Sequence, residues 1–168
     1  MLMARPEDQI LICVARRSLD VAATANLRQL LRKDLDWNYL LVMAQRHRVV
    51  PSLHHHLVTE CPEAIPSKVS SSLEKLNQEN TRSNLLLTGE LLKLVDLLEA
   101  HGIAAVPFKG PTLALWAYGD VGRREFGDLD ILVHKQDVPA VRKLLAGEGF
   151  TPRPELSAAQ QAASLRFD

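Results

Sequence analysis

Apolar residues recur about every three or four positions through the first hundred residues, which is the spacing of helices buried along one side. The pattern predicts helices over residues 7–17, 26–33, 37–46 and 52–59, followed by a proline-containing linker over residues 60–67. Asp36 is the expected N-cap of the third helix, because its carboxylate can accept a hydrogen bond from a free N–H group of the first turn. The first part of the chain is therefore predicted to be helical.

The longest helical pattern covers residues 67–100. Its predicted buried stripe consists of Leu85, Leu86, Leu91, Leu92, Val95 and Leu98. Asn80, Ser83 and Gly89 weaken the pattern, so it predicts either one long helix or two shorter ones. Gly102 is a suitable stop, because glycine readily adopts the left-handed conformation that ends many helices.

The period changes after Gly102. The pattern then predicts a strand over residues 103–108, a helix over 111–118, a glycine-containing loop over 119–127, a strand over 130–134 and a helix over 137–147. Asp137 is the expected N-cap of the last helix, and a third strand could begin at Phe150. We therefore predict an α+β fold, in which a helical region (residues 1–100) packs on a partial α/β unit (residues 101–168) with a small mixed sheet.

Length and charge limit the classes of function. A chain of 168 residues forms one ordinary domain or two small ones. Its 20 basic and 20 acidic residues are balanced in both halves, which disfavours general nucleic-acid binding but leaves room for a local phosphate site. The apolar run at residues 10–15 is too short to span a membrane, and Cys13 and Cys61 do not have the spacing of a zinc site. We expect a soluble, cytoplasmic protein with no membrane partner.

Candidate chemistry is concentrated in the second half of the chain. Lys109 and Gly110 lie where a predicted strand turns into a helix, and backbone N–H groups at such a turn can bind phosphate. Asp128 and Asp130 are two residues apart at the start of a strand, so both carboxylates are expected on one face. Oxygen ligands of this kind favour Mg²⁺ or Mn²⁺, and Arg124 would add a cationic contact to a nucleotide phosphate.

Simpler interpretations accompany each of these features. Two aspartates at a strand end are often only solvated, and the chain would then be a helical scaffold. The three histidines at residues 54–56 cannot converge on one ion, because consecutive helical side chains point about 100° apart. Trp37 and Trp116 lie among apolar neighbours, so we expect both to be packed.

Taken in order, these residues resemble the uncharacterised nucleotidyltransferase-like family of the DNA polymerase β superfamily, with its pattern GI…KG…Y…R…DxDLLV…GF. The matching positions are Gly102, Ile103, Lys109, Gly110, Tyr118, Arg124, Asp128, Asp130, Leu132, Val133, Gly149 and Phe150. The helical region is similar to the family's leader at Asp36-Trp37, Ala44, the run over residues 47–51, and residues 80–84. The resemblance covers nearly the whole chain.

The resemblance implies a metal-dependent nucleotidyltransferase that moves a nucleoside monophosphate from an NTP to the hydroxyl of an unknown acceptor. Asp128 and Asp130 would be the catalytic metal ligands, and Lys109, Gly110 and Arg124 would bind the nucleotide. The superfamily usually has Gly-Ser where this chain has Lys109-Gly110.

The superfamily also uses a third carboxylate on a later strand. Glu155 and Asp168 are poor candidates for it, because one is flanked by a proline and the other is the last residue. A catalytically inactive nucleotide-binding or protein-interaction module therefore remains the alternative.

Overall fold

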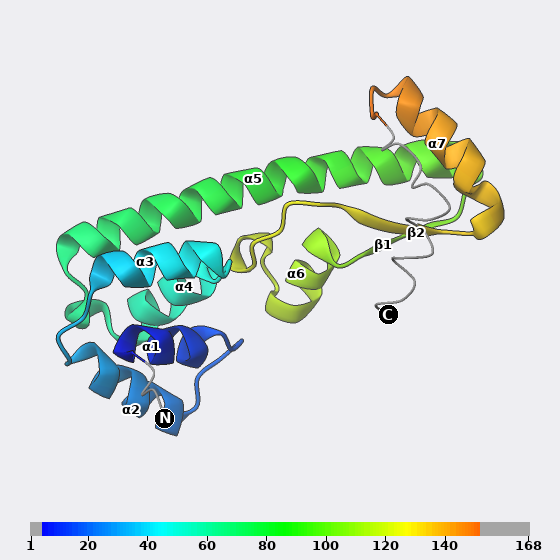
Figure 1. Cartoon of the computed structure of the whole chain (residues 1–168). Helices are drawn as coiled ribbons and strands as arrows, with labels where there is room; N and C mark the ends of the chain where they lie inside the picture. Colours follow the sequence, from blue (N-terminus) through cyan, green and yellow to red (C-terminus); the bar gives the residue numbers. More distant parts are fainter. Residues whose placement is uncertain (1–4, 152–168) are drawn as a thin grey trace, which may run out of the picture.

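The computed structural model describes residues 5–151 (Figure 1). Its helices are α1 (Pro6–Val14), α2 (Val21–Leu31), α3 (Trp37–Arg46), α4 (Val50–Glu60), α5 (Ser67–Ala100), α6 (Gly110–Tyr118) and α7 (Val138–Gly147), with short 3-10 helices η1 (Pro62–Ala64), η2 (Val121–Arg123) and η3 (Lys135–Asp137). Its strands are β1 (Ala105–Phe108) and β2 (Asp130–Val133). The α+β class predicted from the sequence is confirmed.

Helices α1 to α4 gather at one end of the molecule around an apolar core (Figure 1). Leu27, Leu40 and Leu53, from three different helices, are each 0% exposed. Asp36 caps α3 as predicted, since its carboxylate accepts a 3.0 Å hydrogen bond from the Tyr39 N–H. Helix α2 begins earlier than predicted, because Asp20 caps it by accepting a 2.7 Å hydrogen bond from the Ala23 N–H.

Helix α5 is one continuous helix, which decides between the two alternatives left open by its sequence. It runs along the whole described structure, from α1–α4 at one end to the two strands at the other (Figure 1). Beyond Ala100 the chain turns at Gly102, whose φ of +69° confirms the predicted stop. The helix therefore links the helical region to the strands.

The predicted leucine stripe of α5 is only partly correct. Leu91 and Leu98 are buried, whereas Leu85, Leu86 and Leu92 are more than half exposed. At the level of Leu85 and Leu86, the buried side of α5 faces polar backbone groups of the loop around η2, so that Asn84 occupies the buried position. The spacing of apolar residues cannot predict this part of the buried face, because the residue buried there is the polar Asn84.

Strands β1 and β2 form an antiparallel pair in which Phe108 lies opposite Asp130 and Ala105 lies opposite Val133. Ile131 and Val133 face an apolar cavity that is also lined by residues of α5 and α7. On the other face of the pair, Val106 and Leu132 are 61% and 55% exposed. The described sheet is thus antiparallel rather than mixed, and the third strand predicted from Phe150 lies almost wholly beyond the described residues.

Asp137 occupies the predicted N-cap position of α7, and of the two tryptophans expected to be packed only one is. Asp137 directly precedes α7, but its side chain makes no capping hydrogen bond. Trp37 packs against the helical core, whereas Trp116 on α6 is 83% exposed.

Between residues 5 and 151, none of the helices is both long enough and apolar enough to cross a membrane. The proposed division of the chain at residue 100 stays a prediction, since α5 contacts elements on both sides of it.

Candidate functional site

The turn between β1 and α6 has an unusual backbone conformation. Lys109, the N-cap of α6, has a φ of 57° and a ψ of −147°, a region of backbone space occupied almost only by glycine. Gly110 follows with a φ of +39°. The Lys109 carbonyl accepts a 2.9 Å hydrogen bond from the Leu113 N–H, so the strained residue is tied into the first turn of α6. Surrounding structure therefore holds a lysine where an L-residue is disfavoured.

Gly110 lies directly against the segment that leads into β2. A Cβ atom at Gly110 would come within 3.3 Å of the Asp128 carbonyl oxygen and within 3.9 Å of the Phe126 ring. Phe126 is only 5% exposed, so its ring is buried next to the turn. The absence of a side chain at Gly110 therefore lets the turn approach the backbone of Asp128 closely.

Lys109 reaches the second aspartate. Its Nζ lies 3.8 Å from Oδ2 of Asp130 and 4.7 Å from the centre of the Phe108 ring. The two charged side chains are 54% and 35% exposed, so their ion pair contributes about 1 kcal/mol or less. Asp128 is exposed. Because this pair is weak, Lys109 can exchange Asp130 for a phosphate, and Asp130 can exchange Lys109 for a cation.

The loop over residues 119–127 is fastened to α5 by amide side chains. Asn84, which is 0% exposed, donates hydrogen bonds of 2.6 Å to the Val121 carbonyl and 2.7 Å to the Arg124 carbonyl. Asn80 donates a 3.0 Å hydrogen bond to the Gly122 carbonyl. These bonds fix the backbone from which Arg124 extends.

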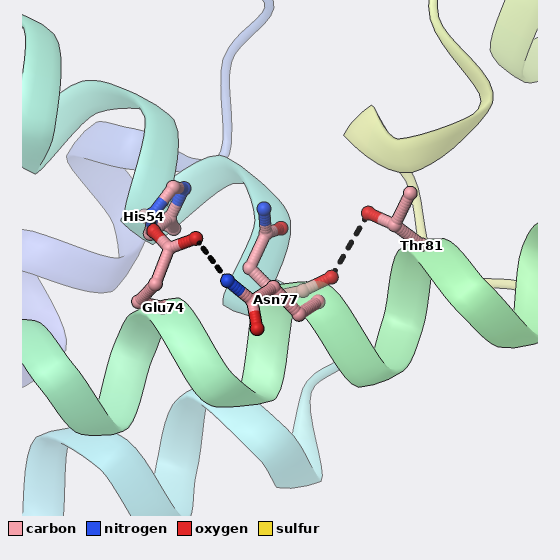
Figure 2. Close-up of polar contacts among 5 residues, drawn as sticks. His54, Glu74, Asn77 and Thr81 are labelled. Atoms are coloured by element: carbon pink, nitrogen blue, oxygen red, sulfur yellow. Dashed lines mark hydrogen bonds and ion pairs between the residues drawn. The ribbon is translucent and has the colours of Figure 1, made fainter.

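The loop also packs closely on Thr81 of α5. A Cβ atom at Gly122 would lie 2.8 Å from the Thr81 hydroxyl oxygen, so only glycine fits there without a shift. The same hydroxyl donates a 2.9 Å hydrogen bond to the Asn77 carbonyl one turn earlier (Figure 2). Hydrogen bonding and close packing together define the position of η2 on the helix.

A polar cavity of about 320 Å³ lies between this loop and the junction of α3 with α4. Its charged and polar lining includes His47, Arg48, Ser52, Arg123, Arg124 and Asp128. Nε of Arg123 and Nη1 of Arg124 are buried and have no hydrogen-bond partner within the described part of the chain. Two arginines with an unsatisfied buried donor thus line the same cavity as Asp128.

The surroundings of this loop disfavour additional positive charge. Burial lowers the pKa of the Arg123 guanidinium, and Asp120 partly opposes that change. Burial also lowers the pKa of His55 on α4, and the Arg123 charge contributes to the same shift. Both directions are those expected where a cation is partly removed from water.

The structure brings the predicted site residues together in two groups. Lys109 lies beside Asp130, and Gly110 lies beside Asp128. Arg124 lines the polar cavity together with Asp128, whereas Lys109 is not part of that lining. The roles of all five residues stay predictions.

Sequence reasoning missed two basic residues and one amide at this place. Arg48 lies within the run over residues 47–51 that resembles the family's leader, and Asn84 closes the second such run, so both signals were present. Arg123 directly precedes the candidate Arg124, and its sequence position alone does not single it out. The positions of Arg48, Arg123 and Asn84 around the loop can be recognised only in the folded structure, because these residues come from segments that are far apart in the sequence.

Two of the three adjacent histidines on α4 contact protein groups. His54 lies 2.8 Å from the Glu74 carboxylate, which it faces across the α4–α5 contact (Figure 2), whereas His56 bonds to the Arg16 carbonyl at 2.9 Å. Within residues 5–151, no group of three or more His, Cys, Asp or Glu side chains could hold a metal ion. A metal at this site would depend on Asp128 and Asp130, with further ligands from outside the described protein groups.

Comparison with known proteins agrees with the geometry. The family model described as "Uncharacterised nucleotidyltransferase" matches residues 33–164. The chain belongs to this nucleotidyltransferase family, which confirms the resemblance seen in the sequence. No curated protein and no solved structure matches the chain significantly.

Proposed function

We propose that this protein is a metal-dependent nucleotidyltransferase that moves a nucleoside monophosphate from an NTP to an acceptor hydroxyl. The observation that carries the proposal is the contact of the Lys109-Gly110 turn with Asp130, at the start of β2, and with the backbone of Asp128, two residues before it. A phosphate-binding turn and a pair of carboxylates are thereby adjacent. Family membership supports the general nucleotidyltransferase role.

Asp128 and Asp130 suit Mg²⁺ or Mn²⁺. Mg²⁺ is commonly bound by one or two carboxylates together with waters and substrate phosphates, so a third protein ligand is not a condition for binding. When bound, the ion would neutralise phosphate charge and orient the nucleotide. The weak Lys109–Asp130 pair would open, so that the ammonium group meets a phosphate oxygen while the carboxylate meets the cation.

The remaining residues would bind and orient the nucleotide. The backbone at Gly110 can approach phosphate oxygens at the start of α6, where the helix dipole also favours negative charge. Arg124 would add a charge-assisted hydrogen bond from the loop that Asn84 holds in place. The acceptor hydroxyl would attack the α-phosphate, with pyrophosphate as the leaving group.

The second candidate function is a nucleotide-binding or protein-interaction module without catalytic activity. It is favoured by one observation, namely that no cluster of three acidic or other metal-binding side chains occurs between residues 5 and 151. The poor candidates Glu155 and Asp168 lie outside the described residues. The two functions share nucleotide binding and differ in pyrophosphate release.

Calorimetry of Mg²⁺ and ATP binding to the whole chain tests the proposal. The double variant Asp128→Asn/Asp130→Asn should weaken Mg²⁺-dependent ATP binding by roughly ten-fold or more, because charge-assisted contacts are lost. The matched control, Asp34→Asn/Asp96→Asn, removes the same charge from exposed positions and should bind as the parent does.

Pyrophosphate release over a panel of NTPs and hydroxyl acceptors then separates the two functions. Release that depends on Asp128 and Asp130 supports the enzyme, and Mg²⁺-dependent binding without release supports the inactive module. A parent chain that does not bind ATP in the presence of Mg²⁺ would contradict both.

We also propose a cytoplasmic location. Cys13 and Cys61 are both buried and unbridged. Free thiols of this kind are typical of reducing compartments, in which disulfides are rare. Fractionation of the producing cells tests this point.

A further inference from the structure

The polar cavity contains more positive than negative charge. Arg48, Arg123 and Arg124 line it, and Glu125 and Asp128 are the acidic residues in its lining. Glu125 lies 3.9 Å from Arg48, and their side chains are 33% and 65% exposed, so this contact is a weak ion pair. Three arginines and two acidic residues therefore line this space, and the acidic residue next to Arg48 is only weakly paired with it.

Two of these guanidinium groups lack acceptors. Nε of Arg123 and Nη1 of Arg124 are buried without a hydrogen-bond partner among the described residues. Buried polar groups are nearly always hydrogen-bonded, and a buried charged donor without an acceptor is unfavourable. An oxyanion in the cavity that these arginines line would supply the missing acceptors once the two side chains turn toward it.

Arg48 is held in a strained backbone conformation at the edge of the same cavity. Its φ is 56°, in the left-handed region that L-residues seldom adopt. The Val49 N–H bonds to the Ala44 carbonyl at 2.9 Å and the Arg48 N–H bonds to the Gln45 carbonyl at 3.1 Å, which is the Schellman motif.

The same motif ends two other helices, and both have glycine at the left-handed position. Gly102 after α5 and Gly149 after α7 have φ values of +69° and +89°. Glycine has no steric cost at such a position. Arg48, at the end of α3, is therefore less favourable for stability than glycine would be. Strain retained beside a cavity is a reason to look for a binding role.

We propose that this cavity is an oxyanion site in which Arg48, from the helical region, acts together with Arg123 and Arg124 of the η2 loop. The ligand is a phosphate-type group, from either the nucleotide or an anionic acceptor. The inference rests on the proposed function for its link to catalysis, because Asp128 lines the cavity. It gives the helical region a direct part in substrate binding.

Metal-free titration of the whole chain with tripolyphosphate, in the presence of a chelator, tests the site itself. The parent should bind, and binding should weaken as salt is raised. Arg124→Gln should lower the affinity by roughly ten-fold or more, since guanidinium–phosphate contacts are strong charge-assisted hydrogen bonds. Arg48→Gly should lower it less, because Arg48 is the more exposed residue.

Arg48→Gly also separates binding from folding. Glycine suits the left-handed position, so its melting temperature should equal or exceed that of the parent while its oxyanion affinity falls. The matched control is Arg32→Gln, which removes a charge from an exposed helix end away from the cavity and should leave affinity unchanged. The proposal is overturned if tripolyphosphate does not bind to the parent, or if Arg48→Gly and Arg124→Gln both bind it as the parent does.

The source of the oxyanion follows from a titration of inorganic phosphate at saturating Mg²⁺ and ATP. Displacement of phosphate assigns the cavity to the nucleotide phosphates, and simultaneous binding assigns it to an acceptor. Asp128→Asn/Asp130→Asn distinguishes this inference from the proposed function. It should lose Mg²⁺-dependent ATP binding and yet bind metal-free tripolyphosphate at least as tightly as the parent, because a negative charge leaves the cavity lining.

Discussion

The two ends of the molecule are stabilised by different kinds of interaction. The apolar core extends over α1 to α4 and the beginning of α5, and its members lie within residues 10–73. At the other end, the loop that carries Arg124 is fastened by hydrogen bonds from Asn80 and Asn84 of α5, and few side chains between β1 and α7 are fully buried. We therefore expect the helical region to supply most of the stability, and the segment with the candidate chemistry to depend on polar contacts to α5. Functional segments commonly belong to the less stable parts of a protein.

A cavity in the helical core should have the largest effect. Leu53 on α4 is 0% exposed, so Leu53→Ala should lower the free energy of unfolding by about 2 to 5 kcal/mol. The matched variant Leu132→Ala, in an exposed position on β2, should change it by about 0.5 kcal/mol or less. Urea denaturation measures both. Equal losses would show that the two ends contribute similarly to stability.

Asn84→Ala attacks the polar attachment instead. The Val121 and Arg124 carbonyls would lose their donor, and we expect a loss of about 1 to 3 kcal/mol in the free energy of unfolding. Hydrogen exchange should increase most in residues 119–127, with α1–α4 unchanged. Asn80→Ala removes a single 3.0 Å bond and should cost less. A larger loss for Asn80→Ala would contradict the central role of Asn84.

Gly89→Ala should have the smallest effect and the opposite sign. Gly89 lies inside α5, and a Cβ atom there would meet nothing within 4 Å. Alanine should therefore raise the free energy of unfolding by about 0.5 to 1 kcal/mol, which thermal unfolding can detect. Gly102→Ala is the control from the end of the same helix, and its φ of +69° should make that substitution destabilising. A gain in both variants would mean that the left-handed turn is not needed.

Regular elements with a clear period could be predicted from the sequence. Helix α3 and its Asp36 cap agree with the prediction, as does the stop at Gly102, because each depends on interactions within a few residues. The signal for the beginning of α2 is also local, because aspartate is a common N-cap residue and Asp20 caps this helix. The prediction began the helix too late. Local signals thus identified most of the elements.

The candidate site could be predicted only in part. The two strands next to Gly110 and Asp128 were predicted, but the antiparallel pairing that brings these residues together was not. The contributions of Arg48 and Asn84 depend on a loop that lies against α5 and the end of α3, a contact between segments far apart in sequence. Nothing in the local pattern of either residue specifies that contact. The exposure of Trp116 was missed for the same reason, because apolar sequence neighbours need not be spatial ones.

The continuity of α5 sets the rotational phase between the two ends of the molecule. Leu73 lies in the helical core and Asn84 holds the η2 loop, and an unbroken helix joins them. Inserting one residue between them would rotate everything beyond by about 100° and advance it by about 1.5 Å. Arg124 would then swing away from Arg48, although every side chain of the site would still be present. The number of residues along this helix, and not only their identity, therefore determines whether the two ends can share the proposed oxyanion.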